Sequence, residues 1–255
     1  ANPDNPETYF NLGNFYSAQN KVQKSIAAYQ KAVEMDPYYA QAHNNLGIAY
    51  READRNFDAL VSFKNAVDSD PRFAEAYNNL GVAYKETDNF MEAISSYKKA
   101  VKISPGYAEA YNNLGFAYKA INQTAQAIAS YKKTIAIDPG YAQAYYNLGT
   151  IYAETGRNED ALASIQKTIE LDPGFAKAYS HLGNIYRALN NDEEAIASYK
   201  KSLELDPSYA LAYNNLAAAY FHMEQYALAI EYCEKAKELG FTNTALLEAL
   251  KPYRK

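Results

Sequence analysis

The sequence has one cysteine, no long apolar run and no excess of positive charge. Because Cys233 has no second cysteine to pair with, no internal disulfide and no cysteine-based metal site can form. No apolar stretch approaches the roughly 18 residues that a membrane-spanning helix needs, so we expect no direct membrane insertion. A net charge of −5 argues against binding nucleic acid, which requires concentrated Lys and Arg.

The opening residues 1–6 have neither a basic segment nor an apolar core, so no signal peptide is expected there. The compartment stays open between the cytoplasm and, if a signal peptide has been removed, the periplasm. Hydrophobic residues make up 48% of the chain and charged residues 22%, which is typical of a soluble folded protein and excludes disordered, collagen-like and disulfide-rich classes.

The dominant feature of the sequence is a repeat of 34 residues, and no insertion or deletion interrupts it. A Gly directly follows six of seven equally spaced leucines, a Tyr follows each leucine four residues later, and Pro recurs at the same interval. The leucines are Leu12, Leu46, Leu80, Leu114, Leu148, Leu182 and Leu216.

Each repeat predicts two helices. When position 1 is set at Pro6, Ala40, Ala74, Ala108, Ala142, Ala176 and Ala210, an aromatic, Leu, Gly and Tyr fall at positions 4, 7, 8 and 11. This spacing lines one face of a first helix. A small residue, an aliphatic one and an aromatic, such as Ala59, Leu60 and Phe63, line one face of a second helix. That helix should end at Asp-Pro, because the residue before proline avoids the α region. Gly106, Gly140 and Gly174 are expected to give the following turn its flexibility.

This pattern resembles the tetratricopeptide repeat (TPR) family. The resemblance implies an all-α fold, an α-solenoid of helix-turn-helix units in a right-handed superhelix. We expect one solenoid domain over residues 1–255, ending in a capping helix at 244–255 whose leucines cover the last repeat. The expected repeats are 6–39, 40–73, 74–107, 108–141, 142–175, 176–209 and 210–243.

The individual residues indicate packing rather than chemistry. Gly at position 8 should let the paired helix approach closely, and most of the 26 tyrosines occupy repeated packing positions. His43 and Cys233 replace packing aromatics, and the three histidines lie in distant repeats and cannot form a metal triad. No nucleophile motif and no phosphate-binding loop is present. We therefore expect no enzyme activity, no metal and no cofactor.

The resemblance implies that first helices line a concave groove, where positions 5 and 6 are rich in asparagine. A carboxamide both donates and accepts hydrogen bonds, so it can pair with a peptide backbone of any sequence. The series resembles the asparagine ladder in the TPR superhelix of O-GlcNAc transferases. The alternative is that these amides serve helix packing. The candidates are Asn11, Asn45, Asn79, Asn113, Asn147, His181 and Asn215 at position 6, and Asn44, Asn78, Asn112 and Asn214 at position 5.

Repeats two to four predict the main part of the groove. Position 9 holds a large apolar residue and position 12 a cation, at spacings that place them on the same face as the amides. Such a face suits an extended segment with hydrophobic anchors and some acidic character. The alternative is that the cations, with Glu7, Glu75 and Glu109 at the other helix end, only complement the helix dipole. The residues are Ile48, Val82 and Phe116, followed by Arg51, Lys85 and Lys119.

The sequence thus predicts a non-catalytic scaffold that binds an extended peptide or partner segment, of unknown identity, in a groove. Two alternatives remain. One is a self-assembling homo-oligomer through the apolar terminal repeat, which carries Leu211, Ala218 and Phe221. The other is a substrate-presenting segment of a larger enzyme. A chaperone-type carboxylate clamp is disfavoured, because position 5 never holds Lys and position 6 never holds Arg.

Overall fold

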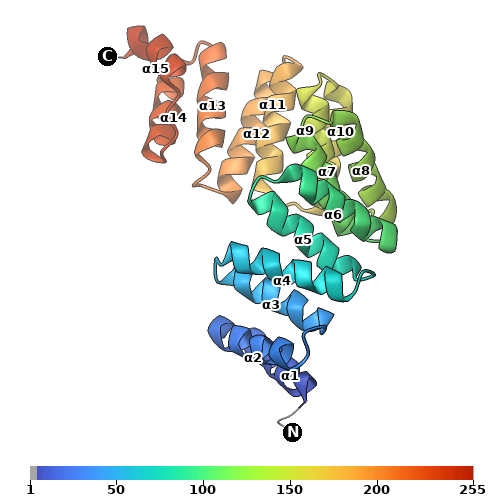
Figure 1. Cartoon of the computed structure of the whole chain (residues 1–255). Helices are drawn as coiled ribbons and strands as arrows, with labels where there is room; N and C mark the ends of the chain where they lie inside the picture. Colours follow the sequence, from blue (N-terminus) through green and yellow to red (C-terminus); the bar gives the residue numbers. More distant parts are fainter. Residues whose placement is uncertain (1–4, 255) are drawn as a thin grey trace. The chain divides into compact units, whose positions relative to one another are not determined.

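The computed structural model describes residues 5–254, and all regular structure within that range is helical (Figure 1). The residues form two compact units, one ending at Ile137 and one beginning at Asp138. The first unit contains α1 (Pro6–Ser17), α2 (Val22–Met35), α3 (Ala40–Glu52), α4 (Asn56–Ser69), α5 (Ala74–Glu86), α6 (Phe90–Ile103), α7 (Ala108–Ala120) and α8 (Thr124–Ile137). The second contains α9 (Ala142–Glu154), α10 (Asn158–Leu171), α11 (Ala176–Ala188), α12 (Asp192–Leu205), α13 (Ala210–His222), α14 (Tyr226–Glu238), α15 (Thr244–Leu250) and the short 3₁₀ helix η1 (Lys251–Tyr253).

Within each unit, an odd-numbered helix packs on the helix that follows it, and each pair packs on the next pair. Figure 1 shows this order in the first unit, where α1 and α2 lie beside α3 and α4. The all-α repeat fold predicted from the sequence is therefore confirmed. The expectation of one continuous domain stays a prediction. None of the helices within residues 5–254 has both the length and the apolar character needed to cross a bilayer.

The glycine at position 8 permits the close approach of the two helices in a pair. A Cβ atom added at Gly81 would lie 2.6 Å from a ring carbon of Tyr97, and one added at Gly115 would lie 2.7 Å from Tyr131. Real Cβ atoms do not come so close to a ring, and a packed core resists the shift that would relieve the clash. The packing role predicted for this glycine is confirmed.

The turn between the two helices of a repeat depends on a residue with positive φ at position 15. Asp54 has φ 57°, and the backbone N–H of Arg55 after it donates to the carbonyl of Tyr50 at 2.8 Å. This is the bond that closes a helix after a left-handed residue. The same conformation occurs at Asn20, Asp54, Asp88, Asn122, Gly156, Asn190 and Glu224.

The turn between repeats is built differently, which corrects the prediction for Gly106, Gly140 and Gly174. None of the three has positive φ, and the aspartate before the proline shapes the turn instead. Asp36 is extended, with φ −132° and ψ 95°, and its Oδ1 accepts from the backbone N–H of Tyr38 at 3.0 Å. The helix thus ends at the residue before Asp-Pro as expected, and the aspartate side chain stabilises the turn.

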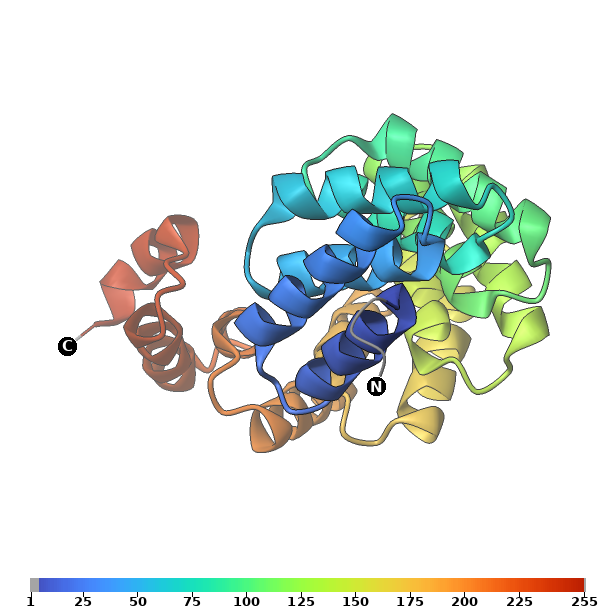
Figure 2. The same cartoon turned by 60° about the horizontal axis from the view of Figure 1, so that its bottom comes forward.

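The C-terminal helix α15 covers the last repeat pair. Leu246 and Leu250 are buried in a cluster with Leu216 and Cys233, and Figures 1 and 2 both show α15 beside α14. Asn243 begins this helix by accepting from the backbone N–H of Leu246 at 3.1 Å. The leucines pack as predicted, but the α-helix is shorter than the expected 244–255: it ends at Leu250, and η1 follows; residue 255 lies outside the described residues.

Positions 9 and 24 form a side-chain hydrogen bond in repeats one and six. In α1 and α11, position 9 is an asparagine whose Oδ1 accepts from a buried tyrosine hydroxyl, from Tyr29 to Asn14 and from Tyr199 to Asn184, each at 2.7 Å. In the third repeat the partner position is Val82, and the buried hydroxyl of Tyr97 has no hydrogen-bond partner. Burial also raises the pKa of the Tyr97 phenol, so it stays neutral.

We expect Tyr97→Phe and Tyr199→Phe to have opposite effects on stability. Removing the unpartnered Tyr97 hydroxyl should leave the free energy of unfolding unchanged or raise it by up to about 1 kcal/mol. Removing the Tyr199 hydroxyl breaks a bond to Asn184 and should lower that free energy by about 0.5–1.5 kcal/mol. Urea titration of the two variants measures the difference, and equal losses in both would contradict it.

Candidate functional site

The predicted site lies on the first helices, and in the first unit its core lies on α3, α5 and α7. We call this surface the first-helix face. It comprises positions 6, 9 and 12 of repeats two to four: Asn45, Ile48, Arg51, Asn79, Val82, Lys85, Asn113, Phe116 and Lys119.

The asparagines at position 5 are not part of an exposed face, which corrects the prediction for Asn44, Asn78, Asn112 and Asn214. Their exposed fractions are 1%, 1%, 8% and 8%. Neighbouring repeats cover them, and a buried amide must find its hydrogen bonds inside the protein. The packing alternative is therefore right for these four residues.

The buried amides connect one repeat to the next. Asn78 Oδ1 accepts from Asn113 Nδ2 at 3.0 Å, and Asn78 Nδ2 donates to Glu109 Oε1 at 3.3 Å. One repeat earlier, Asn44 Oδ1 accepts from Asn79 Nδ2 at 2.9 Å. These side chains form a polar series between first helices, which we call the inter-repeat amide series.

The position-6 asparagines of the first unit keep part of their hydrogen-bonding capacity. Asn45, Asn79 and Asn113 are half-buried, and each donates one Nδ2 hydrogen to the preceding repeat. A carboxamide has two N–H donors and an oxygen with two lone pairs, so each side chain can make further bonds. Asn11 on α1 is exposed.

The apolar residues at position 9 are not equally exposed. Val82 is buried at 9% and Ile48 is half-buried against the core, whereas Phe116 is 46% exposed. The predicted run of three exposed apolar residues is therefore wrong for Val82 and only partly right for Ile48. Phe116 is the one large apolar side chain of the face that solvent reaches freely.

The cations at position 12 differ in their contacts. Arg51 forms an ion pair with Glu86 of the next repeat, at 3.3 Å, so its charge is partly neutralised. Lys85 Nζ lies 5.7 Å from the centre of the Phe116 ring, within reach of a cation–π interaction. Lys119 is half-buried at the end of α7. The positive charge of the face therefore lies mainly on Lys85 of α5 and Lys119 of α7.

In the second unit the corresponding residues make a different surface. Asn147 Oδ1 accepts from Gln143 Nε2 at 2.9 Å, and Asn215 Nδ2 donates to Asn184 Oδ1 at 3.1 Å. His181 stands edge-on to Tyr146, with ring centres 5.1 Å apart, and burial raises the pKa of Tyr146 to about 12. A cleft of about 290 Å³ lies beside His181 and Asn184. The sequence analysis did not predict that Asn14 and Asn184, at position 9, accept a hydrogen bond from a buried tyrosine. In both of these repeats the tyrosine follows fifteen residues later, so the pairing could have been predicted.

Comparison with known families accounts for the whole pattern. Models described as TPR repeat match residues 13–54, 49–88 and 183–224, and models described as tetratricopeptide repeat match 72–139, 122–185 and 210–240. A solved structure, MamA, is 33% identical, with a TM-score of 0.60, over 65% of this chain and 96% of its own. The chain belongs to the tetratricopeptide repeat family.

Further TPR structures share the fold. YrrB, a TPR protein with an unusual peptide-binding site, is 24% identical over 72% of this chain and 95% of its own, with a TM-score of 0.60. PilF of Pseudomonas aeruginosa is 20% identical over 84% of this chain and 96% of its own, with a TM-score of 0.74. No curated protein matches the sequence. The likeness of the asparagine series to that of O-GlcNAc transferases stays a prediction.

TPR repeats indicate a protein–protein interaction scaffold, and this coarser part of the predicted function follows from the family. Among residues 5–254, no group of three or more His, Cys, Asp or Glu side chains is arranged to hold a metal ion. Cys233 is buried and His43 is 7% exposed, with its Nε2 2.9 Å from the carbonyl oxygen of Pro37, so both occupy packing positions as expected.

Proposed function

We propose that the first-helix face of repeats two to four binds an extended peptide segment of a partner protein, without catalysis. The observation that supports this most is Phe116, a large ring 46% exposed among polar side chains. Binding energy in protein interfaces is concentrated in a few aromatic or apolar anchors surrounded by polar contacts. Phe116 would be that anchor, against an apolar side chain of the peptide.

The asparagines beside Phe116 suit the backbone of the same peptide. Asn79 and Asn113 each use one amide hydrogen within the protein and retain a donor and an acceptor. They occupy the same position in consecutive repeats, so they can contact successive peptide groups. Such contacts hold an extended chain without reading its side chains, which leaves selectivity to the anchor and to charge.

The charges indicate an acidic group in the peptide near Phe116. Glu86 already pairs with Arg51, whereas Lys85 lies against the Phe116 ring. A carboxylate next to the apolar anchor could approach the Lys85 ammonium group. This interaction should be weakened by salt, because the group is partly solvated.

The test is binding of a fluorescent peptide library to the protein and to Phe116→Ala. Selected peptides should lose affinity by about tenfold or more in this variant, because an exposed anchor is removed. Phe57→Ala is the matched control, since Phe57 is 77% exposed on the second helix α4 and outside the first-helix face. The control should bind the same peptides with unchanged affinity.

Selective binders that bind Phe116→Ala and Phe57→Ala equally well would refute the proposal, and so would the absence of any binder. Sedimentation would then test the self-assembly alternative at the terminal repeat. There Leu211 is 36% exposed, while the ring of Phe221 already packs against Tyr226 with ring centres 5.7 Å apart.

A further inference from the structure

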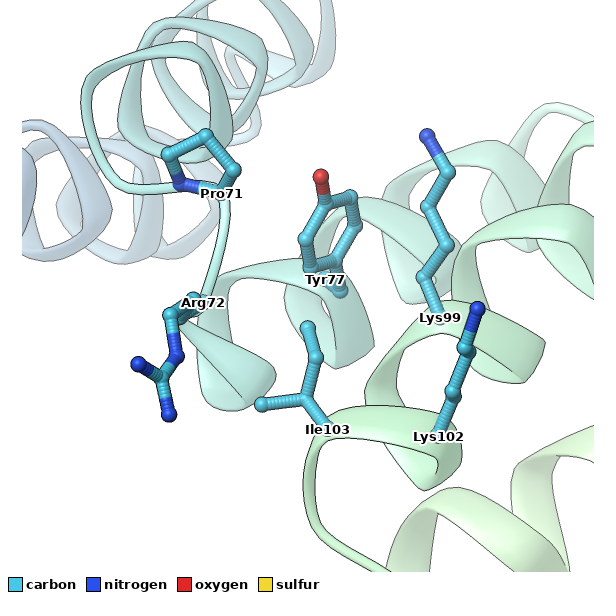
Figure 3. A pocket seen from close by; sticks show the side chains of 6 residues that line it. All are labelled: Pro71, Arg72, Tyr77, Lys99, Lys102 and Ile103. Atoms are coloured by element: carbon cyan, nitrogen blue, oxygen red, sulfur yellow. The ribbon is translucent and has the colours of Figure 1, made fainter.

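A basic cleft lies between the end of the second repeat and the third repeat, away from the first-helix face. It has a volume of about 480 Å³ and is lined by Pro71, Arg72, Tyr77, Lys99, Lys102 and Ile103. Figure 3 shows Lys99 and Lys102 extending from α6 beside the Tyr77 ring, with Arg72 on the opposite side. Three of these six residues are cations and none is acidic, in a chain whose net charge is −5.

Lys102 is a cation at position 29, where most other repeats have an acidic residue. In repeats one, five and six, the lysine at position 26 forms an ion pair with a glutamate three residues later, at 2.6–3.2 Å. In the third repeat, Lys99 at position 26 is followed by Lys102 at position 29, so an ion pair is replaced by two like charges. The pairs in the other repeats are Lys31–Glu34, Lys167–Glu170 and Lys201–Glu204.

Arg72 is a second departure on the same cleft. The equivalent residues in repeats three, four and five are Gly106, Gly140 and Gly174. The turn does not require arginine, because its backbone N–H bond to Asp70 Oδ1, at 2.9 Å, has the same geometry as that of Gly140 to Asp138. Arg72 and Lys102 therefore add positive charge to the cleft where local structure does not demand it.

We propose that this basic cleft binds an acidic segment of a partner protein. Tyr77 is 7% exposed and is held by Lys99, whose Nζ lies 5.1 Å from its ring centre, so the floor of the cleft is ordered. Pro71, Tyr77 and Ile103 supply apolar surface for the carbon atoms of a side chain, and the cations supply partners for its carboxylates.

The neighbouring surface favours a peptide over other anions. Tyr77 and Lys99 also line a second cleft, of about 330 Å³, which therefore adjoins the first. That cleft contains Lys64 but also the carboxylates Asp68 and Glu92. A uniformly negative polymer such as RNA would be repelled there, whereas a peptide can place acidic residues in one cleft and polar or basic residues in the other. This site is separate from the proposed function, which rests on Phe116.

The experiment measures binding of a short fluorescent peptide rich in Glu and Tyr, and of the same peptide with Gln in place of every Glu. We expect the protein to bind the first and not the second. Lys102→Glu should weaken binding by about tenfold or more, since it removes a cation and adds a repulsive charge. This variant should fold, because it restores the ion pair of three other repeats. Arg72→Gly should also weaken binding.

Lys133→Glu is the charge-matched control, since it makes the same change at an exposed position of α8. It should leave the affinity unchanged. Equal weakening by Lys133→Glu would overturn the proposal in favour of a bulk charge effect. Loss in Phe116→Ala with none in Lys102→Glu would place the acidic peptide on the first-helix face. Pyrophosphate that displaces the peptide at equal concentration would indicate a small-anion site, and no binding would also refute the proposal.

Discussion

Gly115→Leu should lower the free energy of unfolding by about 1–3 kcal/mol, and by more if the backbone cannot adjust. The added Cβ alone would lie 2.7 Å from a ring carbon of Tyr131, and the rest of the leucine has to enter the same space. Tyr131 is fully buried, so its ring has little room to move. Chemical denaturation followed by circular dichroism measures this loss.

Gly106→Leu is the control for this prediction. A Cβ at Gly106 meets no atom within 4 Å, and its φ is not positive. We therefore expect stability to change by no more than about 0.5 kcal/mol. Similar losses in both variants would show that the larger side chain itself, rather than its contact with Tyr131, determines the effect.

Asn78→Ala should lower the free energy of unfolding by about 2–3 kcal/mol, although asparagine is often tolerant of substitution. The change removes the acceptor of Asn113 and the donor to Glu109 in one step, and it leaves a space at a residue that is 1% exposed. Each lost hydrogen bond costs about 0.5–1.5 kcal/mol, and the space left at the buried site adds to that loss. Urea titration gives the loss directly.

Asn79→Ala is the matched variant, because Asn79 is the adjacent residue and is half-buried at the first-helix face. It removes the donor to Asn44 Oδ1, a buried acceptor, which should cost about 1–3 kcal/mol, and unlike Asn78→Ala it should also weaken peptide binding. If both variants stay folded and weaken peptide binding equally, the division between a buried inter-repeat amide series and an exposed face is wrong.

The periodic part of the structure could be predicted from the sequence. Helix pairs, the close approach at position 8 and the burial of Cys233 and His43 follow from a spacing that repeats without interruption. The left-handed residue at position 15 was also readable, since Asn20, Asp54, Asp88 and Asn122 recur there. It was overlooked because the glycines elsewhere in the repeat were a more familiar signal for a turn.

The sequence does not predict in the same way which asparagines are buried and which lie on the first-helix face. Asn44 and Asn45 are adjacent and chemically identical, and a helix turns by about 100° between them. Which of the two is buried depends on how the neighbouring repeat packs. The spacing of residues within one repeat does not determine that packing. The burial of Val82 and the exposure of Phe116 could not be predicted either, because both share position 9 and both repeats have a tyrosine at position 24.

The inter-repeat amide series affects how such a chain can lengthen. Repeats two, three and four each carry the acceptor at position 5 and the donor at position 6, so a unit of this kind matches a copy of itself. A gene duplication could insert a second copy of repeat three directly after the original. The two copies would then form both of these side-chain hydrogen bonds where they meet. The fifth and sixth repeats, with Tyr146 and Ser180 at position 5, lack that acceptor amide and would not join their own copies in this way. Growth by duplication is therefore chemically easier in the first unit.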